Sequence, residues 1–260
     1  MRPILKSAPP YRALCHPNLA STQAADWLRD PRRLLPRGVE APWRGLTPCG
    51  RWFVKYREVS RLAALRPGSS DRFTRTMPLG LKLEVQRQPI SIPLALIEGP
   101  GVVGRGQGRW LMMDAVSGLN LAQFVAESPL DASLAILGKL AQALAQFHDR
   151  GFRQRDLKAP NVMVGEGGEL VLVDLEGMRA LDGPAHWKLR AKDLGRLAAS
   201  FQSPAFLKAG FLPEHWDELL RLYIDSCEGT AWTREALSEQ TLRYARRKVA
   251  KNMAAGRPLA

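Results

Sequence analysis

The first half of the chain contains short runs in which apolar and polar residues alternate, which is the pattern of β-strands. In the clearest run, residues 50–59, apolar side chains at every second position predict one buried face, and Lys55 falls on the other face with Phe53. Two further runs of strand length, residues 90–98 and 109–116, are joined by the glycine-rich segment GPGVVGRGQG. Because a strand rather than a helix follows the glycines, we expect a hairpin and not a phosphate-binding loop.

Apolar residues recur at helical spacing through most of the second half. This spacing predicts helices over residues 119–125 and 132–149, and the second ends before Gly151, because a glycine at the C′ position allows the left-handed backbone that closes a helix. Residues 161–175 hold two apolar, β-branched runs around a Gly-rich turn, which predicts a hairpin. Three more helices are predicted further along the chain: residues 192–201, 213–227 and 233–252.

Three N-terminal segments have weaker patterns. Residues 1–20 carry prolines without periodicity and predict an irregular extension, whereas residues 21–30 predict a short helix capped by Ser21 or Thr22. Residues 69–88 have helical spacing but contain an internal proline and glycine, which predict a kinked or two-piece helix. The whole pattern therefore predicts an α+β protein with a β-rich first part and a mainly helical second part.

Composition adds a strong positive charge to this picture. Apolar residues make up 45% and charged residues 24% of the chain, which is ordinary for a globular protein. Lys and Arg outnumber Asp and Glu by 38 to 25, a formal charge of +13. Such a charge attracts nucleic acid, acidic lipid or phosphorylated substrates, although an Arg-rich solvated surface explains it equally well. No recognised nucleic-acid-binding motif accompanies the basic residues, so we expect no specific nucleic acid partner.

Cysteine usage and hydropathy predict a reducing compartment. The three cysteines, Cys15, Cys49 and Cys227, form no CxxC pair, which favours neither a disulfide framework nor a zinc site. No window approaches 18 uninterrupted apolar residues, and prolines interrupt the N-terminus before the core of a signal peptide develops. We therefore expect a cytoplasmic protein without a membrane span.

The segment GFRQRDLKAPNVMV, residues 151–164, places several polar side chains between apolar runs. Asp156 is followed five positions later by Asn161, and the predicted hairpin returns the chain so that Asp174 lies beside Asn161. One carboxylate and one amide oxygen suit Mg²⁺ held against nucleotide phosphates. Asp156 can then orient an attacking hydroxyl and accept its proton, and Lys158 can neutralise the transferred phosphoryl group. A charged turn between a helix and a strand is the structural alternative.

The same residues resemble the signature of the protein-kinase-like superfamily. QRDLKAPN resembles the catalytic loop H-R-D-L-x-x-x-N, VDLEG stands where those proteins have D-F-G, and RWFVKYRE supplies the strand lysine. LMMDAVSG resembles the hinge whose backbone contacts adenine, and Asp193 corresponds to the aspartate that braces the catalytic loop. The resemblance implies a two-lobed kinase-like fold, with a small β-rich N-lobe over residues 1–113 and a helical C-lobe over residues 114–260. It implies ATP and Mg²⁺ as cofactors and assigns contacts with them to five residues: Lys55, Asp114, Val116, Asn161 and Asp174.

Within that superfamily the pattern FHDRGF…RDL…N…LVDLEG, the YREVSRL that includes the residues after Lys55 and the later RLYIDSC are together similar to the lipopolysaccharide-core kinases, the Kdo/heptose kinase group. Asp193 follows Asp174 by only 19 positions without an A-P-E, which leaves little platform for a peptide. The group phosphorylates sugar hydroxyls of the lipid-linked core, which implies an acidic glycolipid or a related small molecule as acceptor. It also implies a peripheral position at the inner face of the inner membrane. Residues 233–252 offer a basic helical face for anionic lipid, unless they form an ordinary solvated helix.

Several positions depart from the kinase pattern. Gln154 stands where His is usual, which removes a group that braces the backbone but no catalytic group, and Glu176 replaces the Gly of D-F-G. No G-x-G-x-x-G precedes Lys55, and the carboxylate that should pair with it is open between Asp71, Glu84 and none. These departures keep a pseudokinase scaffold or binding module as the alternative function, while the missing peptide platform disfavours a protein Ser/Thr kinase.

Overall fold

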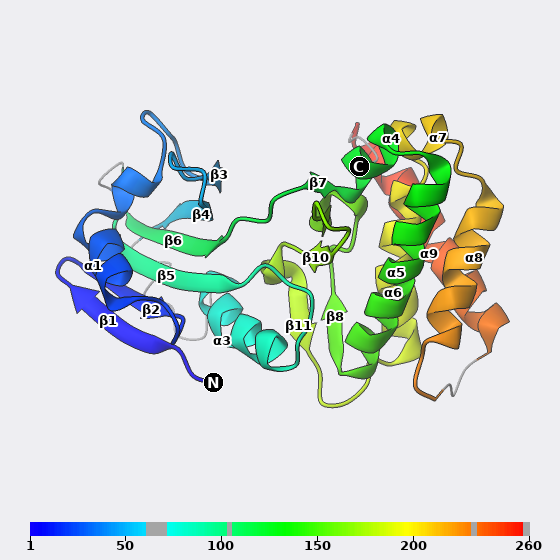
Figure 1. Cartoon of the computed structure of the whole chain (residues 1–260), viewed down its shortest axis with the longest axis horizontal. Coiled ribbons are helices and arrows are strands. Elements are labelled where there is room, and N and C mark those ends of the chain that lie inside the picture. Colours follow the sequence, from blue (N-terminus) through cyan, green and yellow to red (C-terminus); the bar gives the residue numbers. More distant parts are fainter. Residues whose placement is uncertain (61–71, 103–105, 230–232, 257–260) are drawn as a thin grey trace. The chain divides into compact units, whose positions relative to one another are not determined.

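The computed structural model describes residues 1–60, 72–102, 106–229 and 233–256. The chain divides into two compact units, Met1–Val116 and Ser117–Ala260, whereas the sequence pattern placed the division between residues 113 and 114. The first unit is rich in strands and the second in helices, so the expected α+β class is confirmed (Figure 1).

The N-terminal unit is built on one antiparallel sheet, in which the described residues form six strands (Figure 1). In spatial order they are β1 (Ile4–Ala8), β2 (Tyr11–Cys15), β5 (Pro93–Pro100), β6 (Gln107–Asp114), β4 (Trp52–Val59) and β3 (Trp43–Leu46). β5 and β6 form the predicted hairpin. β4 pairs with β6 along its whole length and sets Lys55 opposite Leu111, so the lysine lies in the middle of the sheet.

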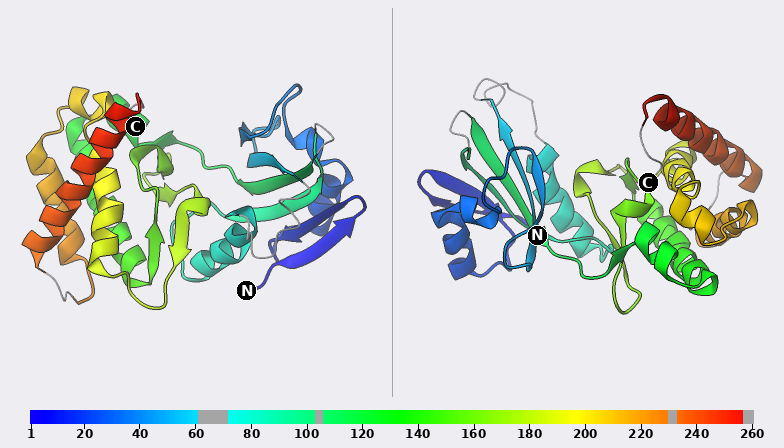
Figure 2. Two further views of the ribbon diagram at one scale, coloured as in Figure 1. Left: turned by 180° about the vertical axis from the view of Figure 1, so that it is seen from behind. Right: turned by 90° about the horizontal axis from the view of Figure 1, so that it is seen from above.

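Two helices flank this sheet, one on each face. They are α1 (Ser21–Arg29), which leads into the 3-10 turn η1 (Pro31–Leu34), and α3 (Arg72–Val85). Tyr56 of β4 belongs to a hydrophobic core that includes Trp27 of α1. On the opposite face, the Arg57 guanidinium lies 4.5 Å from the ring centre of Phe73 in α3. The right view of Figure 2 shows the sheet between the two helices.

The prediction of an irregular extension over residues 1–20 is wrong. β1 and β2 form a hairpin, and β2 pairs with β5, so the extension adds two strands to the sheet. Pro9 and Pro10 occupy the turn of this hairpin, where a missing N–H group removes no ladder hydrogen bond. The prolines that hid the strands from sequence reasoning therefore mark the turn between them.

Two predictions about helix ends and continuity are also wrong. The residue before α1 is Ala20, which offers no side-chain cap, so neither Ser21 nor Thr22 caps the helix. α3 is a single helix with Pro78 inside it, so of the two alternatives predicted here the two-piece helix is wrong and a kink stays a prediction. Met77 and Leu81 are at most 1% exposed, which shows that burial of one face outweighs the poor helix propensity of proline here.

The C-terminal unit is mainly helical (Figure 1). Its helices are α4 (Leu121–Glu127), α5 (Leu130–Asp149), α6 (Trp187–Ser200), α7 (Pro204–Lys208), α8 (Pro213–Asp225) and α9 (Arg234–Ala254). α5 packs against α8, and α6 packs against α9. The predicted helices are confirmed, but α6 begins before residue 192 and α7 was not predicted. None of the helices that the structure describes is long and apolar enough to cross a bilayer.

Five short strands complete this unit. They are β7 (Leu119–Asn120), β8 (Phe152–Gln154), β9 (Val162–Val164), β10 (Leu170–Leu172) and β11 (Met178–Ala180). β9 and β10 form the predicted hairpin, whereas the pairing of β8 with β11 was not predicted. Strands of three residues carry too little alternation to be recognised in a sequence.

Candidate active site

The polar segment 151–164 follows the end of α5 and begins with a turn that has little space for side chains. Gly151 has φ = 78°, the left-handed conformation expected at the C′ position. A Cβ atom at this position would lie 2.5 Å from the carbonyl oxygen of Gly183, so only glycine fits. β8 then pairs with β11 and brings Gln154 beside the chain that follows Asp174.

Gln154 ties this segment to the backbone around Asp174. The residue is 1% exposed, and its Nε2 donates hydrogen bonds to the carbonyl oxygens of Val173 at 3.2 Å and Asp174 at 3.1 Å. Its Oε1 accepts a hydrogen bond from the backbone N–H of Asp156 at 3.2 Å. The expectation that glutamine removes a backbone-bracing group is therefore wrong, because the amide supplies both a donor and an acceptor. A Cβ atom at Gly177 would lie 2.3 Å from Oε1, so glycine is needed there to leave room for the amide.

Asp156, Lys158 and Asn161 contact one another. Lys158 Nζ lies 3.3 Å from Asp156 Oδ2, and the two side chains are 39% and 41% exposed. Asn161 is 9% exposed, and its Nδ2 donates to the carbonyl oxygen of Asp156 at 2.8 Å. Because the amide nitrogen of Asn161 points to Asp156, the amide oxygen is the atom left for a metal ion. The carboxylate of Asp156 remains accessible enough to meet a substrate.

Asp174 has an uncommon backbone conformation. Its φ of 63° and ψ of 56° are left-handed, which is rare for a residue other than glycine and is often found at functional sites. The N–H of Val173 donates to the carbonyl oxygen of Asn161 at 3.0 Å, so Asn161 and Asp174 lie on adjoining stretches of backbone. One amide and one carboxylate oxygen fit Mg²⁺, which keeps water and phosphate among its ligands. Across the described ranges, no group of three or more His, Cys, Asp or Glu side chains gathers as a metal site.

Asp193 of α6 supports the segment from inside the C-terminal unit. Its side chain is fully buried, and Oδ1 lies 2.6 Å from Nη2 of Arg153. Arg153 directly precedes Gln154, so the ion pair holds the base of β8 against α6. His148 Nε2 lies 3.7 Å from Asp193 Oδ2, which is longer than a hydrogen bond, while His148 Nδ1 lies 2.8 Å from the hydroxyl of Tyr223.

A second buried ion pair extends this support to the end of α5. Arg190 Nη2 lies 2.7 Å from Asp149 Oδ1. Burial lowers the pKa of His148, and the carboxylate of Asp193 opposes this shift only in part. Sequence reasoning missed Arg153, His148 and Arg190. In the sequence, these three residues differ from their surroundings only in being charged or polar within apolar, periodic runs, which can indicate buried polar contacts.

Lys55 lies in the N-terminal unit. It is 9% exposed, and strand alternation places it on the sheet face that carries Arg57, away from the core under α1. Glu84, one of the two carboxylates considered as a partner for Lys55, lies with Oε2 2.7 Å from Nε2 of His16. Asp71, the other carboxylate, lies outside the described residues.

The predicted hinge residues end the same unit. The N–H of Asp114 donates to the carbonyl oxygen of Ile92 at 3.0 Å, and its carbonyl accepts from Ser91 Oγ at 2.9 Å. A contact between Asp114 and adenine would therefore use the second lone pair of this carbonyl. Val116 follows β6 and is partly exposed.

The part of the chain that contains these residues is similar to a known protein family. Residues 104–223, a little under half of the chain, match the model of the lipopolysaccharide kinase (Kdo/WaaP) family. The match includes the whole segment 151–164 as well as Asp174 and Asp193. Residues 104–223 are thus similar to the lipopolysaccharide kinase family over this part of the chain. The match supports a kinase-like protein.

Other known proteins share shorter or more distant similarity with this chain. A stretch of 68 residues is 35% identical to the serine/threonine-protein kinase max-2 of Caenorhabditis elegans and covers 25% of this chain and 10% of that protein. Two structures of the kinase-methyltransferase WbdD, one with a kinase inhibitor, are 21% and 22% identical, with TM-scores of 0.39 and 0.41. The similarity covers 75% of this chain and 42% and 41% of those chains, so this chain matches less than half of WbdD.

Proposed function

We propose that the protein is an ATP- and Mg²⁺-dependent phosphotransferase that acts on a sugar hydroxyl of the lipopolysaccharide core or of a related small molecule. The set of hydrogen bonds around Gln154 carries this proposal. These bonds join the backbone of Asp156 to the backbone of Asp174 within the region that matches the model of the lipopolysaccharide kinase family. A plain charged turn would not need a buried amide that connects these two carboxylate-bearing residues.

Asp156 is the proposed general base. Its carboxylate would accept the proton of the acceptor hydroxyl while that oxygen forms a bond to the γ-phosphorus and the bond from phosphorus to the ADP oxygen breaks. Lys158, 3.3 Å from Asp156 Oδ2, would neutralise charge on the transferred phosphoryl group. Both side chains are partly exposed, as groups that meet a substrate must be.

The remaining proposed roles concern the nucleotide and its metal ion. Asn161 through Oδ1 and Asp174 through its carboxylate would hold Mg²⁺, which supplies positive charge to the phosphates when bound. Lys55 is proposed to contact the α- and β-phosphates, and the backbones of Asp114 and Val116 to contact adenine.

A small or glycolipid acceptor follows from the short chain after Asp174. This stretch is fully described, and between Asp174 and α6 it holds only η3 (Leu175–Gly177), β11 and a turn. β11 has only three residues and one of its edges is already paired with β8, so it offers little backbone to an extended peptide. The positive charge of the chain favours an acidic acceptor, for which the core oligosaccharide with its lipid is the proposed example.

We further propose that the end of α9 contacts an anionic membrane from the cytoplasmic side. Five cations follow one another there without an acidic residue: Arg243, Arg246, Arg247, Lys248 and Lys251. Within the part of the chain that the structure describes, none of the five forms an ion pair. Leu242 and Met253 are 37% and 71% exposed beside them, which adds an apolar component suited to the bilayer interface.

Vesicle sedimentation tests this membrane contact. Replacing Arg246, Arg247 and Lys251 by Gln should weaken binding to vesicles with 30% anionic lipid by at least about tenfold, because each cation near such a surface contributes about 1 kcal/mol. Replacing three exposed cations outside α9, Arg29, Arg75 and Lys208, by Gln is the matched control and should have a smaller effect. Equal effects of the two triple variants would contradict a specific role of α9.

The proposed reaction is tested by ATP turnover against a panel of core oligosaccharides and small polyols, with mass spectrometry of the products. We expect one class of sugar acceptor to gain the mass of a single phosphoryl group in a Mg²⁺-dependent reaction. A peptide product in place of a sugar product would assign the acceptor to the wrong class.

A pseudokinase scaffold remains the second candidate, and one observation favours it. The turn that leads into the strand of Lys55, residues 47–51 between β3 and β4, contains Gly50 as its single glycine, so it lacks the Gly-rich sequence that covers the phosphates in kinases. A thermal-shift titration separates the two functions. A catalytic protein should be stabilised by ATP together with Mg²⁺ more than by ATP alone, whereas a scaffold without metal-nucleotide binding should show no metal-dependent shift.

A further inference from the structure

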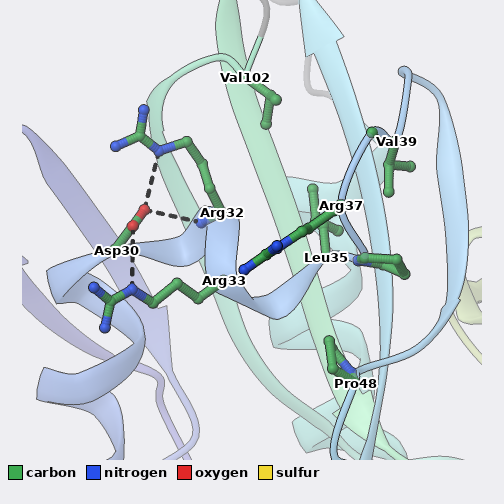
Figure 3. Close-up of a pocket in the computed structure, with 10 residues that line it drawn as sticks. Asp30, Arg32, Arg33, Leu35, Arg37, Val39, Pro48 and Val102 are labelled. Atoms are coloured by element: carbon green, nitrogen blue, oxygen red, sulfur yellow. Dashed lines mark hydrogen bonds and ion pairs between the residues drawn. The ribbon is translucent and has the colours of Figure 1, made fainter.

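A cavity of about 640 Å³ lies in the N-terminal unit beside η1. Its walls come from η1, the loop that follows it, the turn between β3 and β4, and the end of β5 (Figure 3). This volume falls within the range of small-molecule sites, which are usually apolar with a few polar groups that fix the ligand. The cavity matches that description on both counts.

The polar side of the cavity is made of arginines. Asp30 lies between two of them, with Oδ1 3.0 Å from Nε of Arg32 and Oδ2 3.4 Å from Nε of Arg33. Both contacts use Nε, so the Nη groups of the two guanidiniums remain for a ligand. Arg37 extends from the following loop across the pocket towards η1, and in the described parts of the chain it forms no ion pair or hydrogen bond (Figure 3). One carboxylate against three guanidiniums leaves a local excess of positive charge.

The other side of the cavity is apolar. Leu35 is 6% exposed and joins the core under α1, and Val39 packs against the same core. Pro48 and Val102 complete this wall. Gly38, with φ = 75°, turns the chain between Arg37 and Val39, so that a cation and an apolar side chain from one loop line the same cavity.

The cavity is separate from the proposed nucleotide site. Leu35 and Val39 belong to the core that contains Val54 and Tyr56, whereas Lys55 lies on the other face of β4. A ligand in this cavity would therefore bind the opposite face of the sheet from the phosphate-binding lysine.

We propose that this cavity is an accessory binding site for a phosphate group carried on an apolar body. Guanidinium groups bind phosphate through paired N–H donors, and the cavity offers the guanidinium of Arg37, which extends across it, with Arg32 and Arg33 at its edge. An apolar wall of this extent favours a ligand whose phosphate is attached to a hydrophobic part, as in a phospholipid headgroup with its chains, over free phosphate. The proposal does not rest on the proposed reaction, because binding here requires neither nucleotide nor catalysis.

Calorimetric titration of the full chain with three probes tests the proposal. The probes are dihexanoyl phosphatidic acid below its micellar concentration, inorganic phosphate, and hexyl glucoside, which has an apolar chain but no charge. We expect the phosphatidic acid to bind at least tenfold more tightly than either of the other two. If inorganic phosphate binds as tightly as phosphatidic acid, the apolar wall contributes nothing to binding and the proposal fails. If hexyl glucoside binds as tightly, the arginines contribute nothing and the proposal fails as well.

Substitutions then locate the binding. Arg37→Ala removes an exposed side chain without an ion pair among the described residues, so the fold should be retained, and it should weaken phosphatidic acid binding at least tenfold. Arg29→Ala removes an arginine of α1 that lies outside the cavity and should leave binding unchanged. Unchanged binding in Arg37→Ala, or an equal loss in Arg29→Ala or in the α9 triple variant, would place the ligand elsewhere and overturn the proposal.

Discussion

At the scale of single residues, Gln154 shows what a motif can and cannot reveal. The sequence shows a glutamine in the position of the expected histidine, and comparison with the motif treats that as a lost contact. The partners of the side chain are backbone groups of Val173, Asp174 and Asp156, which no residue type can indicate. An amide and an imidazole can fill the same place because each offers a donor and an acceptor.

Replacing Gln154 by Ala should lower kcat by about 10- to 100-fold, as loss of a group that orients a metal ligand generally does. KM for ATP should change much less, because no atom of Gln154 is proposed to touch the nucleotide. Steady-state kinetics measure both constants. Gln202→Ala, at an exposed position, is the control. A larger effect on KM than on kcat would show that Gln154 acts on nucleotide binding instead of positioning Asp156 and Asp174.

His148 predicts a pH dependence of stability that belongs to the same scale. Because burial lowers its pKa in the folded chain, His148 stays neutral while the unfolded chain takes up a proton below about pH 6.5. The free energy of unfolding should therefore fall as the pH drops from 7.5 to 5.5, by up to about 1 kcal/mol from this residue. Urea denaturation at both pH values measures the change. His148→Gln should reduce this loss, and an identical loss in the variant would rule out His148 as its source.

At the scale of elements, the success of the sequence predictions depended on length. α5 and β4 were recognised because each repeats one period over many residues. β8 and β11 were missed because three residues carry no period, and their pairing is determined by contacts between distant parts of the chain. β1 and β2 were missed because Pro9 and Pro10 interrupt the alternation at the turn.

Two helical glycines, Gly195 of α6 and Gly138 of α5, differ in the space that they leave for a side chain. A Cβ atom at Gly195 would lie 2.6 Å from Tyr244 Cβ and 2.8 Å from the carbonyl oxygen of Thr241, so Gly195→Ala should destabilise the protein by about 1–3 kcal/mol through overpacking. At Gly138 of α5 the nearest atom would lie 3.5 Å away, so Gly138→Ala should be neutral or stabilising by up to about 1 kcal/mol. Chemical denaturation measures both, and a stable Gly195→Ala variant would contradict the close approach of α6 and α9.

At the scale of the whole molecule, the sequence allowed the fold class and the similarity to lipopolysaccharide kinases to be predicted, because the polar residues of such a site follow one another in a fixed order along the chain. The contacts of Asp156, Lys158 and Asn161 agree with that order. Support by buried ion pairs such as Arg153 with Asp193 could not be predicted, because the pairing of two charges depends on the packing of β8 on α6. The joint action of Lys55 with Asp156 remains a proposal, since the two residues belong to different units.

The most direct test of the central claim is transfer of labelled γ-phosphate from ATP to a core oligosaccharide in a single turnover, with wild type and Asp156→Asn compared. If Asp156 is the general base, the variant should transfer phosphate about 10²- to 10⁴-fold more slowly. Its Mg²⁺-dependent stabilisation by ATP, measured by thermal shift, should be retained. Transfer by the variant at the wild-type rate, or no transfer by the wild type to any sugar acceptor, would contradict the assignment of this segment as the active site of a sugar kinase.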